Sequence, residues 1–210
     1  MSQHETAEAL RLLAGVETAT IGHFRDDGFM APSIQGLGEA TRICGPALTA
    51  ALPGDDGSAL AGALAQARPG DVLVVDRQGD ERHACWGAVL TAAALAVGLA
   101  GVVIDGPVTD LTAIRASGLP IWFRGRSPLT TKRRGGGTVG GTVRCGGVTV
   151  RPGDLVLADE NGVAVLDPAE ALAVARYALT LQAEEPGIIA RLRAGETLAD
   201  IQAAAAMRRP

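Results

Sequence analysis

The chain has 210 residues, of which 47% are hydrophobic and 20% are charged, with 28 glycines and 11 prolines. This length and hydrophobic content are sufficient for one folded domain over residues 1–210 and exclude a disordered chain. A net charge of −4 and an aromatic content of 3% leave no basic face and no stacking platform for nucleic acid. We therefore expect no nucleic-acid partner.

The three cysteines, Cys44, Cys85 and Cys145, lie far apart and have no metal-ligand spacing. This pattern favours structural thiols in a reducing compartment and argues against a zinc site. The N-terminus has acidic residues and helical periodicity where a signal peptide has a basic patch and an apolar run. We therefore expect a cytoplasmic protein.

The uncharged stretch 84–104 is long enough to span a bilayer. Glycines interrupt it at Gly87, Gly98 and Gly101, and a β-branched run follows them. A helix, a turn and a buried strand fit this stretch better than a membrane span, so we expect no membrane association.

The first half of the chain alternates between helical and strand patterns. A helix is predicted over 5–14, a second helix through Phe24 has Thr18 or Thr20 as its N-cap, and 29–41 reads as a loop. The strands expected next are 47–52, 72–76, 102–104 and 121–123, and the helices are 57–67, 89–97 and 111–116. Repeated β-α-β units predict a sheet covered by helices.

The second half has different periodicity. Segment 125–147 is rich in glycine, threonine and basic residues, which predicts a long exposed loop, either functional or mobile. Three short strands with turns between them predict a β-meander over 148–150, 155–158 and 163–166. A helical region follows over about 168–206, with a break at Pro186 and Gly187 left open. No stretch has the composition of a linker between domains.

Two predicted strands, 72–76 and 102–104, end next to acidic residues, where open α/β sheets place ligands. Between them a helix opens at Gly87, and the free N–H groups of Gly87, Ala88, Val89 and Leu90 form a candidate anion site. The alternative interpretation of Gly87 is close packing against the sheet.

Asp105 and Asp110 flank the turn after the second of these strands, where a carboxylate can bind a hydrated divalent cation. The commoner role for Asp110 is N-cap of the helix 111–116, and Asp105 can bond to its own turn backbone. His83 is a candidate general base, although a histidine in a charged turn is more often solvated. The basic run 132–134 either binds an anionic substrate or forms a solvated loop, which is commoner.

Sequence blocks in a fixed order carry a family resemblance from about residue 8 to residue 202. The blocks are TATIGHF, CGPALTA, ARPGDVLVVD, WGAVL, GVVIDGPVTD, GLPIWFRG and CGGVTVRPGDLVLADENGVAVL. Together they resemble the divalent-metal-dependent 4-hydroxy-4-methyl-2-oxoglutarate/4-carboxy-4-hydroxy-2-oxoadipate aldolases, a family that includes the RraA-type regulators of ribonuclease E.

The resemblance implies an α/β fold, namely an αββα sandwich of the swivelling phosphohistidine-domain type. It also implies a homotrimer with sites between neighbouring subunits. In the aldolases, Mg²⁺ or Mn²⁺ acts as a Lewis acid on a small anionic 2-oxo acid, and cleavage or decarboxylation passes through a pyruvate-type enolate.

Two positions depart from the family pattern. Asp110 matches the metal-binding aspartate, but Thr109 stands where the family has a substrate-binding arginine. Residues 87–90 match the family's backbone cradle for the substrate carboxylate, but Ala88 replaces its acid. Because both lost groups stabilise charge or move protons, we expect an altered substrate or a weakened reaction.

Other residues are candidates to replace the lost groups. The candidate cations are Arg82, Arg124, Arg126 and Lys132, and the candidate proton carriers are His83 and Asp80. A neighbouring subunit is a further source of carboxylates, and the candidates are Glu184, Glu185 and Glu196. The commoner role for each of them is as a solvated surface residue.

Two functions follow from these observations. The first is a metal-dependent lyase, either an aldolase or an oxaloacetate-type decarboxylase, with Asp110 as metal ligand. The alternative is a catalytically degenerate trimer that regulates a protein partner. The RraA-type regulators lose the aspartate and keep the arginine, the reverse of this chain, which favours the lyase.

Overall fold

The computed structural model describes residues 3–38 and 41–206. Residues 39–40 of the expected loop 29–41, and residues 1–2 and 207–210 of the expected domain, lie outside this range. The helices are α1 (Gln3–Leu13), α2 (Thr18–Gly22), α3 (Ala59–Gln66), α4 (Ala88–Ala96), α5 (Leu111–Ser117), α6 (Pro168–Arg193) and α7 (Leu198–Ala206). The strands are β1 (Gln35–Gly36), β2 (Ile43–Ala51), β3 (Val72–Asp76), β4 (Gly101–Ile104), β5 (Ile121–Phe123), β6 (Thr138–Val139), β7 (Val143–Cys145), β8 (Val148–Val150), β9 (Leu155–Asp159) and β10 (Gly162–Leu166).

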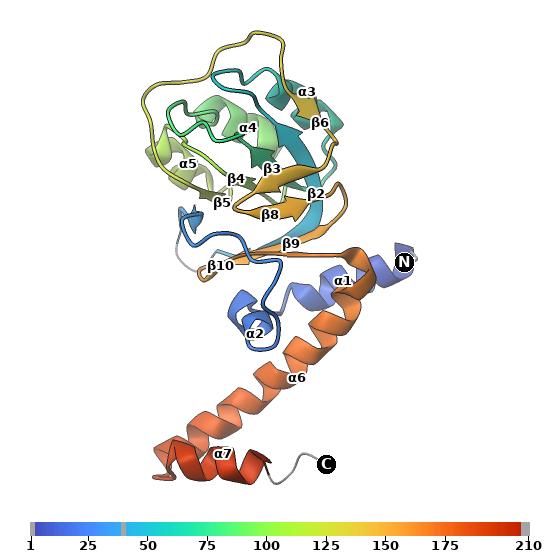
Figure 1. Ribbon diagram of the computed structural model, residues 1–210, viewed down its shortest axis with the longest axis vertical. Coiled ribbons are helices and arrows are strands. Elements are labelled where there is room, and N and C mark those ends of the chain that lie inside the picture. Colours follow the sequence, from blue (N-terminus) through green and yellow to red (C-terminus); the bar gives the residue numbers. More distant parts are fainter. Residues whose placement is uncertain (1–2, 39–40, 207–210) are drawn as a thin grey trace.

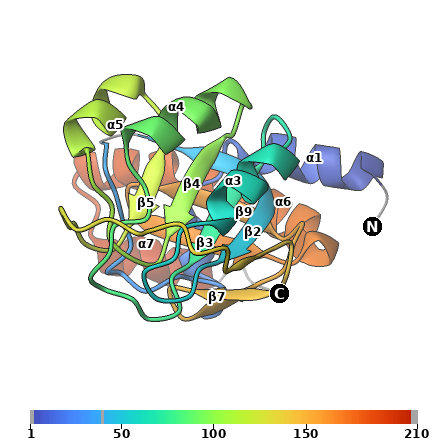
Figure 2. The same ribbon diagram turned by 90° about the horizontal axis from the view of Figure 1, so that it is seen from above.

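Strands β2, β3, β4 and β5 pair in parallel and form the centre of the sheet. The two inner strands are buried along most of their length and consist mainly of valine, leucine and isoleucine, as expected for strands covered on both faces. Helices α3, α4 and α5 cover one face of this sheet (Figure 2). The carboxyl ends of β3 and β4 therefore lie side by side.

The other face carries a second layer of strands. The first residues of β2, Ile43 to Pro46, pair with β9, and the remaining residues pair with β3. β9 and β10 form an antiparallel hairpin, and β7 and β8 form another. Helices α1, α2 and α6 pack on the outer side of β9 and β10, and the distal part of α6 leads away from the sheets to α7 (Figure 1). The order of layers is helix, sheet, sheet, helix.

Some local expectations are wrong. The three strands of the expected meander all form, and the last two pair as a hairpin, but β8 pairs with the preceding β7 rather than with β9, so the expected three-stranded meander does not form. Neither Thr18 nor Thr20 is the N-cap of α2. The N-cap is Glu17, and Thr18 instead donates both its N–H and its hydroxyl to the buried Asp159. The question of a break at Pro186, which the sequence left open, is settled by a continuous α6 that includes Pro186.

No helix within residues 3–38 and 41–206 is both long enough and apolar enough to cross a bilayer. The stretch 84–104 divides into α4, a turn at Gly98 with a φ of +76°, and β4. The helix, turn and strand expected there are confirmed.

The core beneath α3, α4 and α5 provides a test of the packing. Leu73 on β3 is fully buried in this core, whereas Leu95 on α4 is 44% exposed. We expect Leu73→Ala to lower the free energy of unfolding by about 2–5 kcal/mol, because it leaves a cavity. Leu95→Ala changes it by about 0.5 kcal/mol or less. Urea denaturation measures both variants, and equal losses would contradict this layer assignment.

Candidate functional site

The start of α4 and the turn after β4 lie next to each other. Trp86 and Val108 form a parallel bridge, and the Thr109 N–H donates to the Trp86 carbonyl at 2.9 Å. The segment before α4 therefore runs beside residues 108–110. Residues that are more than twenty positions apart in the sequence meet here.

Asp110 has an unusual conformation. Its φ of +55° and ψ of +35° are left-handed, a region that non-glycine residues seldom occupy. Although Asp110 directly precedes α5, its side chain makes no capping bond to that helix. Its Oδ2 accepts instead from the N–H of Ala88, at 2.9 Å. Asp110 does occupy the expected N-cap position of α5, and its carbonyl accepts from the Ile114 N–H at 3.0 Å, but its carboxylate does not cap that helix. The carboxylate serves instead an amide in the first turn of α4, which has no acceptor within its own helix.

Gly87 is required by this contact. A Cβ at position 87 would lie 2.5 Å from Asp110 Oδ2. The close packing expected as the alternative role of Gly87 is therefore packing against the Asp110 carboxylate rather than against the sheet. Because Ala88 donates to Asp110, its amide is not available to a ligand, whereas the amides of Val89 and Leu90 in the same turn have no acceptor within the helix.

Two open cavities meet at Asp110. The first has a volume of about 700 Å³ and lies over the start of α5, and the second has a volume of about 460 Å³ and lies over the start of α4. Ala88, Thr109 and Asp110 line both of them. The second cavity is also lined by Gly87, Val89 and Leu90. The structure thus brings Thr109 and Asp110 together with residues 87–90, as the sequence predicted.

The carboxylate oxygens of Asp110 are suitable ligands for a hard, hydrated cation. The carboxylate is exposed, and its Oδ1 has only a long contact of 3.4 Å from the Thr109 hydroxyl. No group of three His, Cys, Asp or Glu side chains with metal-site geometry occurs in the described part of the chain. One accessible carboxylate suits Mg²⁺ or Mn²⁺, which keep most of their waters, and does not suit a zinc site.

Asp105 and Arg124 are engaged elsewhere. Asp105 accepts from the Gly146 N–H at 2.8 Å and pairs with Arg124 at 3.0 Å, so its partners are not the backbone of its own turn. Arg124 also pairs with Glu81 at 3.0 Å. Of the two candidate cation ligands, only Asp110 lines the cavities, and Asp105 and Arg124 line neither of them.

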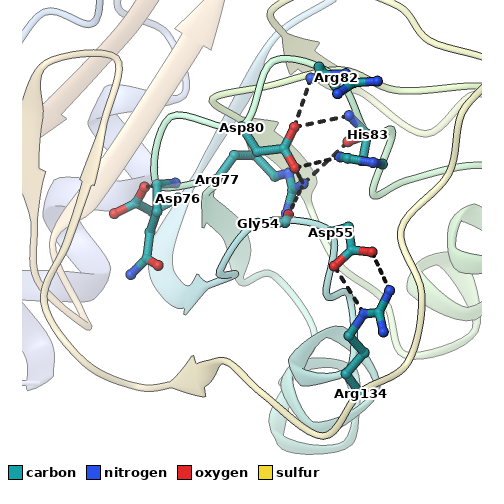
Figure 3. A network of polar contacts seen from close by, with 9 residues as sticks. Gly54, Asp55, Asp76, Arg77, Asp80, Arg82, His83 and Arg134 are labelled. Carbon is teal, nitrogen blue, oxygen red and sulfur yellow. Dashed lines mark hydrogen bonds and ion pairs between the residues drawn. The ribbon is translucent and has the colours of Figure 1, made fainter.

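His83 and Asp80 belong to a structural network around the fully buried Arg77 (Figure 3). Arg77 Nη2 donates to the Gly54 carbonyl at 2.8 Å and lies 3.2 Å from Asp80 Oδ2. The same carboxylate oxygen lies 2.7 Å from His83 Nδ1. Partial burial raises the pKa of Asp80, but N–H donors from Arg82 and His83 and the Arg77 charge lower it by more. Neither His83 nor Asp80 lines the two cavities.

The glycine-rich loop is fixed to the body of the protein by two aspartates that sequence reasoning missed. Arg134 makes two bonds to Asp55, at 3.0 and 2.7 Å (Figure 3). The buried Asp56 accepts from Ser58 and from the N–H groups of Arg134 and Gly136. The turn composition of PGDDGS was the available signal. Within the basic run, Arg134 is thus structural.

The remaining candidates divide by position. Lys132 and Arg133 line the second cavity, and Arg126 lines the first. Arg82 lines neither and uses its N–H to bond Asp80. Glu184 and Glu185 lie in the second half of α6, and Glu196 lies just beyond its end and pairs with Arg191.

The cysteines are free thiols, as expected. Burial raises the pKa of both Cys44 and Cys85 to about 12. Burial also raises the pKa of Cys145. These thiols therefore stay protonated near neutral pH, which is consistent with a structural role.

The hydrogen bonds to Asp56 make the free energy of unfolding depend on pH in the acid range. The Ser58 hydroxyl, followed by the three N–H donors, lowers the pKa of Asp56 well below its ordinary 3.8, although burial opposes this. A carboxylate with a lowered pKa stabilises the fold above its unfolded pKa, and this stabilisation is lost as the pH falls below about 3.8. We expect Asp56→Asn to lower the melting temperature at pH 7 and to lessen its fall below pH 4. Melting curves at pH 7 and pH 2.5 measure this for both proteins. An equal fall of the melting temperature in the two proteins would contradict the prediction.

Comparisons with known proteins agree with the fold. The family model RraA-like, described as Aldolase/RraA, matches residues 18–165. A protein of Halalkalibacterium halodurans named "Putative 4-hydroxy-4-methyl-2-oxoglutarate aldolase" is 35% identical over 156 residues, which cover 74% of each chain.

Two solved structures extend this likeness. Streptomyces coelicolor RraAS2, described as an unusual member of the RNase ES inhibitor RraA protein family, has a TM-score of 0.75 and 29% identity. It covers 88% of this chain and 96% of its own. An uncharacterized protein from Pseudomonas syringae has a TM-score of 0.82 and 27% identity over 94% of both chains. The expected α/β fold is confirmed.

Proposed function

Because the chain belongs to the RraA-like family, some members of which are named aldolases and others inhibitors of RNA processing, we propose that it is a carbon–carbon lyase acting on a small 2-oxo acid. The observation that carries the proposal is the position of Asp110. Its exposed carboxylate lies where two cavities meet and directly beside the first turn of α4. A cation site and an anion site adjoin there.

Each residue has a definite part in this proposal. Asp110 would hold Mg²⁺ or Mn²⁺, which when bound supplies Lewis-acid polarisation of a keto oxygen. The amides of Val89 and Leu90 point out of the first turn of α4 and donate to the substrate carboxylate. The Ala88 amide fixes Asp110 through Oδ2 and leaves Oδ1 with only the long contact from the Thr109 hydroxyl.

The substitutions at positions 88 and 109 shape what the reaction can be. Ala88 carries no acid for moving a proton, and the hydroxyl of Thr109 cannot make the planar two-bond contact of a guanidinium. Losing a charge stabiliser costs on the order of 10²–10³ in rate. A reaction that needs less proton transfer than retro-aldol cleavage, such as a decarboxylation, suits this site best.

Asp110→Asn separates metal binding from folding. The amide oxygen of asparagine still accepts from Ala88, but the negative charge is lost. We expect pyruvate release to fall at least 100-fold, with a melting temperature close to that of the unmodified protein. A lactate dehydrogenase-coupled assay with oxaloacetate and with 4-hydroxy-4-methyl-2-oxoglutarate measures this. Undiminished release by the variant would refute the role of Asp110.

Metal removal tests the cofactor itself. We expect EDTA to abolish pyruvate release and added Mg²⁺ or Mn²⁺ to restore it, with the same metal in protein-free buffer as the background control. Calorimetric titration should show one metal site per chain, which Asp110→Asn loses. Release that persists in EDTA would contradict metal dependence.

A regulatory function is the second candidate. It is supported by the absence of the family acid and arginine at Ala88 and Thr109, and by the RNA-processing inhibitors among the similar structures. A protein that neither binds metal nor releases pyruvate, but retains a stoichiometric protein partner in a pull-down, would favour this function. The homotrimer and its inter-subunit sites stay predictions, which light scattering can test.

A further inference from the structure

Two arginines flank Gly125, and they have different surroundings. Arg124 is half-buried and pairs with both Asp105 and Glu81. Arg126 is exposed, and no carboxylate or side-chain acceptor within the described residues bonds to its guanidinium. The first arginine therefore stabilises the fold, whereas the second has its full hydrogen-bonding capacity available.

The backbone places Arg126 beside the candidate site. Arg126 and Val108 form a parallel bridge, and the Ser127 N–H donates to the Val108 carbonyl at 3.1 Å. Gly125 has a φ of +87°, a left-handed conformation that favours glycine, and its carbonyl accepts from the Val108 N–H at 3.3 Å. Residues on both sides of Arg126 are thus bonded to Val108. Val108 in turn lies two residues before Asp110 in the neighbouring segment.

The lining of the first cavity has one charge of each sign. Its charged side chains are Asp110 and Arg126, and the other lining residues are small, apolar or hydroxylic. Lys132 and Arg133 line the second cavity and not this one. A cation at Asp110 and a guanidinium at Arg126 would face the same space of about 700 Å³.

We propose that Arg126 binds the carboxylate of the 2-oxo acid from the side of the first cavity, in addition to the Val89 and Leu90 amides on the side of the second, and supplies the guanidinium that position 109 lacks. This inference rests on the proposed function. A guanidinium presents two parallel N–H donors that match a carboxylate, a geometry that lysine cannot reproduce. The guanidinium that binds the substrate thus comes from the segment after β5 rather than from the turn after β4.

Binding of oxalate tests this inference without turnover. Oxalate is a planar dianion that resembles the enolate of pyruvate, and calorimetry in Mg²⁺ measures its dissociation constant. We expect Arg126→Gln to weaken oxalate binding about 10- to 100-fold, as for the loss of a charge-assisted hydrogen-bond pair, and to leave Mg²⁺ binding unchanged. Arg126→Lys should recover only part of this loss. Arg144→Gln, on the exposed middle residue of β7, is the matched control and should bind oxalate normally.

A relocation variant adds a gain-of-binding readout. Thr109 lines both cavities, so Thr109→Arg in the Arg126→Gln background should restore oxalate binding. Equal oxalate affinity in Arg126→Gln and the unmodified protein would overturn the inference, as would an unmodified protein that binds Mg²⁺ but no oxalate. Oxalate binding that depends on Arg126, without pyruvate release from either oxo acid, would refute the proposed lyase and leave this inference standing.

Discussion

Strand β2 belongs to both sheets, and the position of the site depends on this sharing. Its first four residues pair with β9 in antiparallel orientation, and the remaining residues pair with β3 in parallel orientation. One continuous strand therefore fixes the parallel sheet relative to the hairpin on which α1, α2 and α6 pack. Because the parallel strands are aligned from β2 outward, the ends of β3 and β4 open on the same side, and the turns that follow them meet the start of α4.

Within that frame, one bond links the two halves of the site. The Asp110 carboxylate satisfies an amide of α4 while its own backbone takes a left-handed conformation, at a cost on the order of 1–3 kcal/mol. Backbone strain that the surrounding structure maintains is often found at functional positions. Here it directs a carboxylate away from its own helix and toward the space between two cavities. The glycine at position 87 is the condition for this arrangement, because a side chain there would displace the carboxylate.

The sequence predicted those elements that depend on local pattern. The buried runs of β3 and β5 have the expected bounds, because β-branched residues between turn signals identify a strand without reference to its partners. The pairing of β8 with β7 was not predictable in this way, since several short strands in succession can pair in several orders. The orientation of Asp110 also escaped prediction, because its position before α5 satisfies the usual N-cap pattern while the competing amide lies 22 residues away.

The attachment of the glycine-rich loop has a consequence for the thermodynamics of ligand binding. Asp55 and Asp56 anchor residues 134–136, and backbone bridges anchor Thr130 and Lys132 to the body, so the path of this loop is set before any ligand arrives. A site built on a mobile loop loses backbone entropy of about 1–2 kcal/mol for each residue that it orders. At this cleft the entropic cost is confined to the side chains that touch the ligand. Affinity is then governed by the match of charge and shape, and a charged group can move from one anchored segment to another during evolution without dismantling the site.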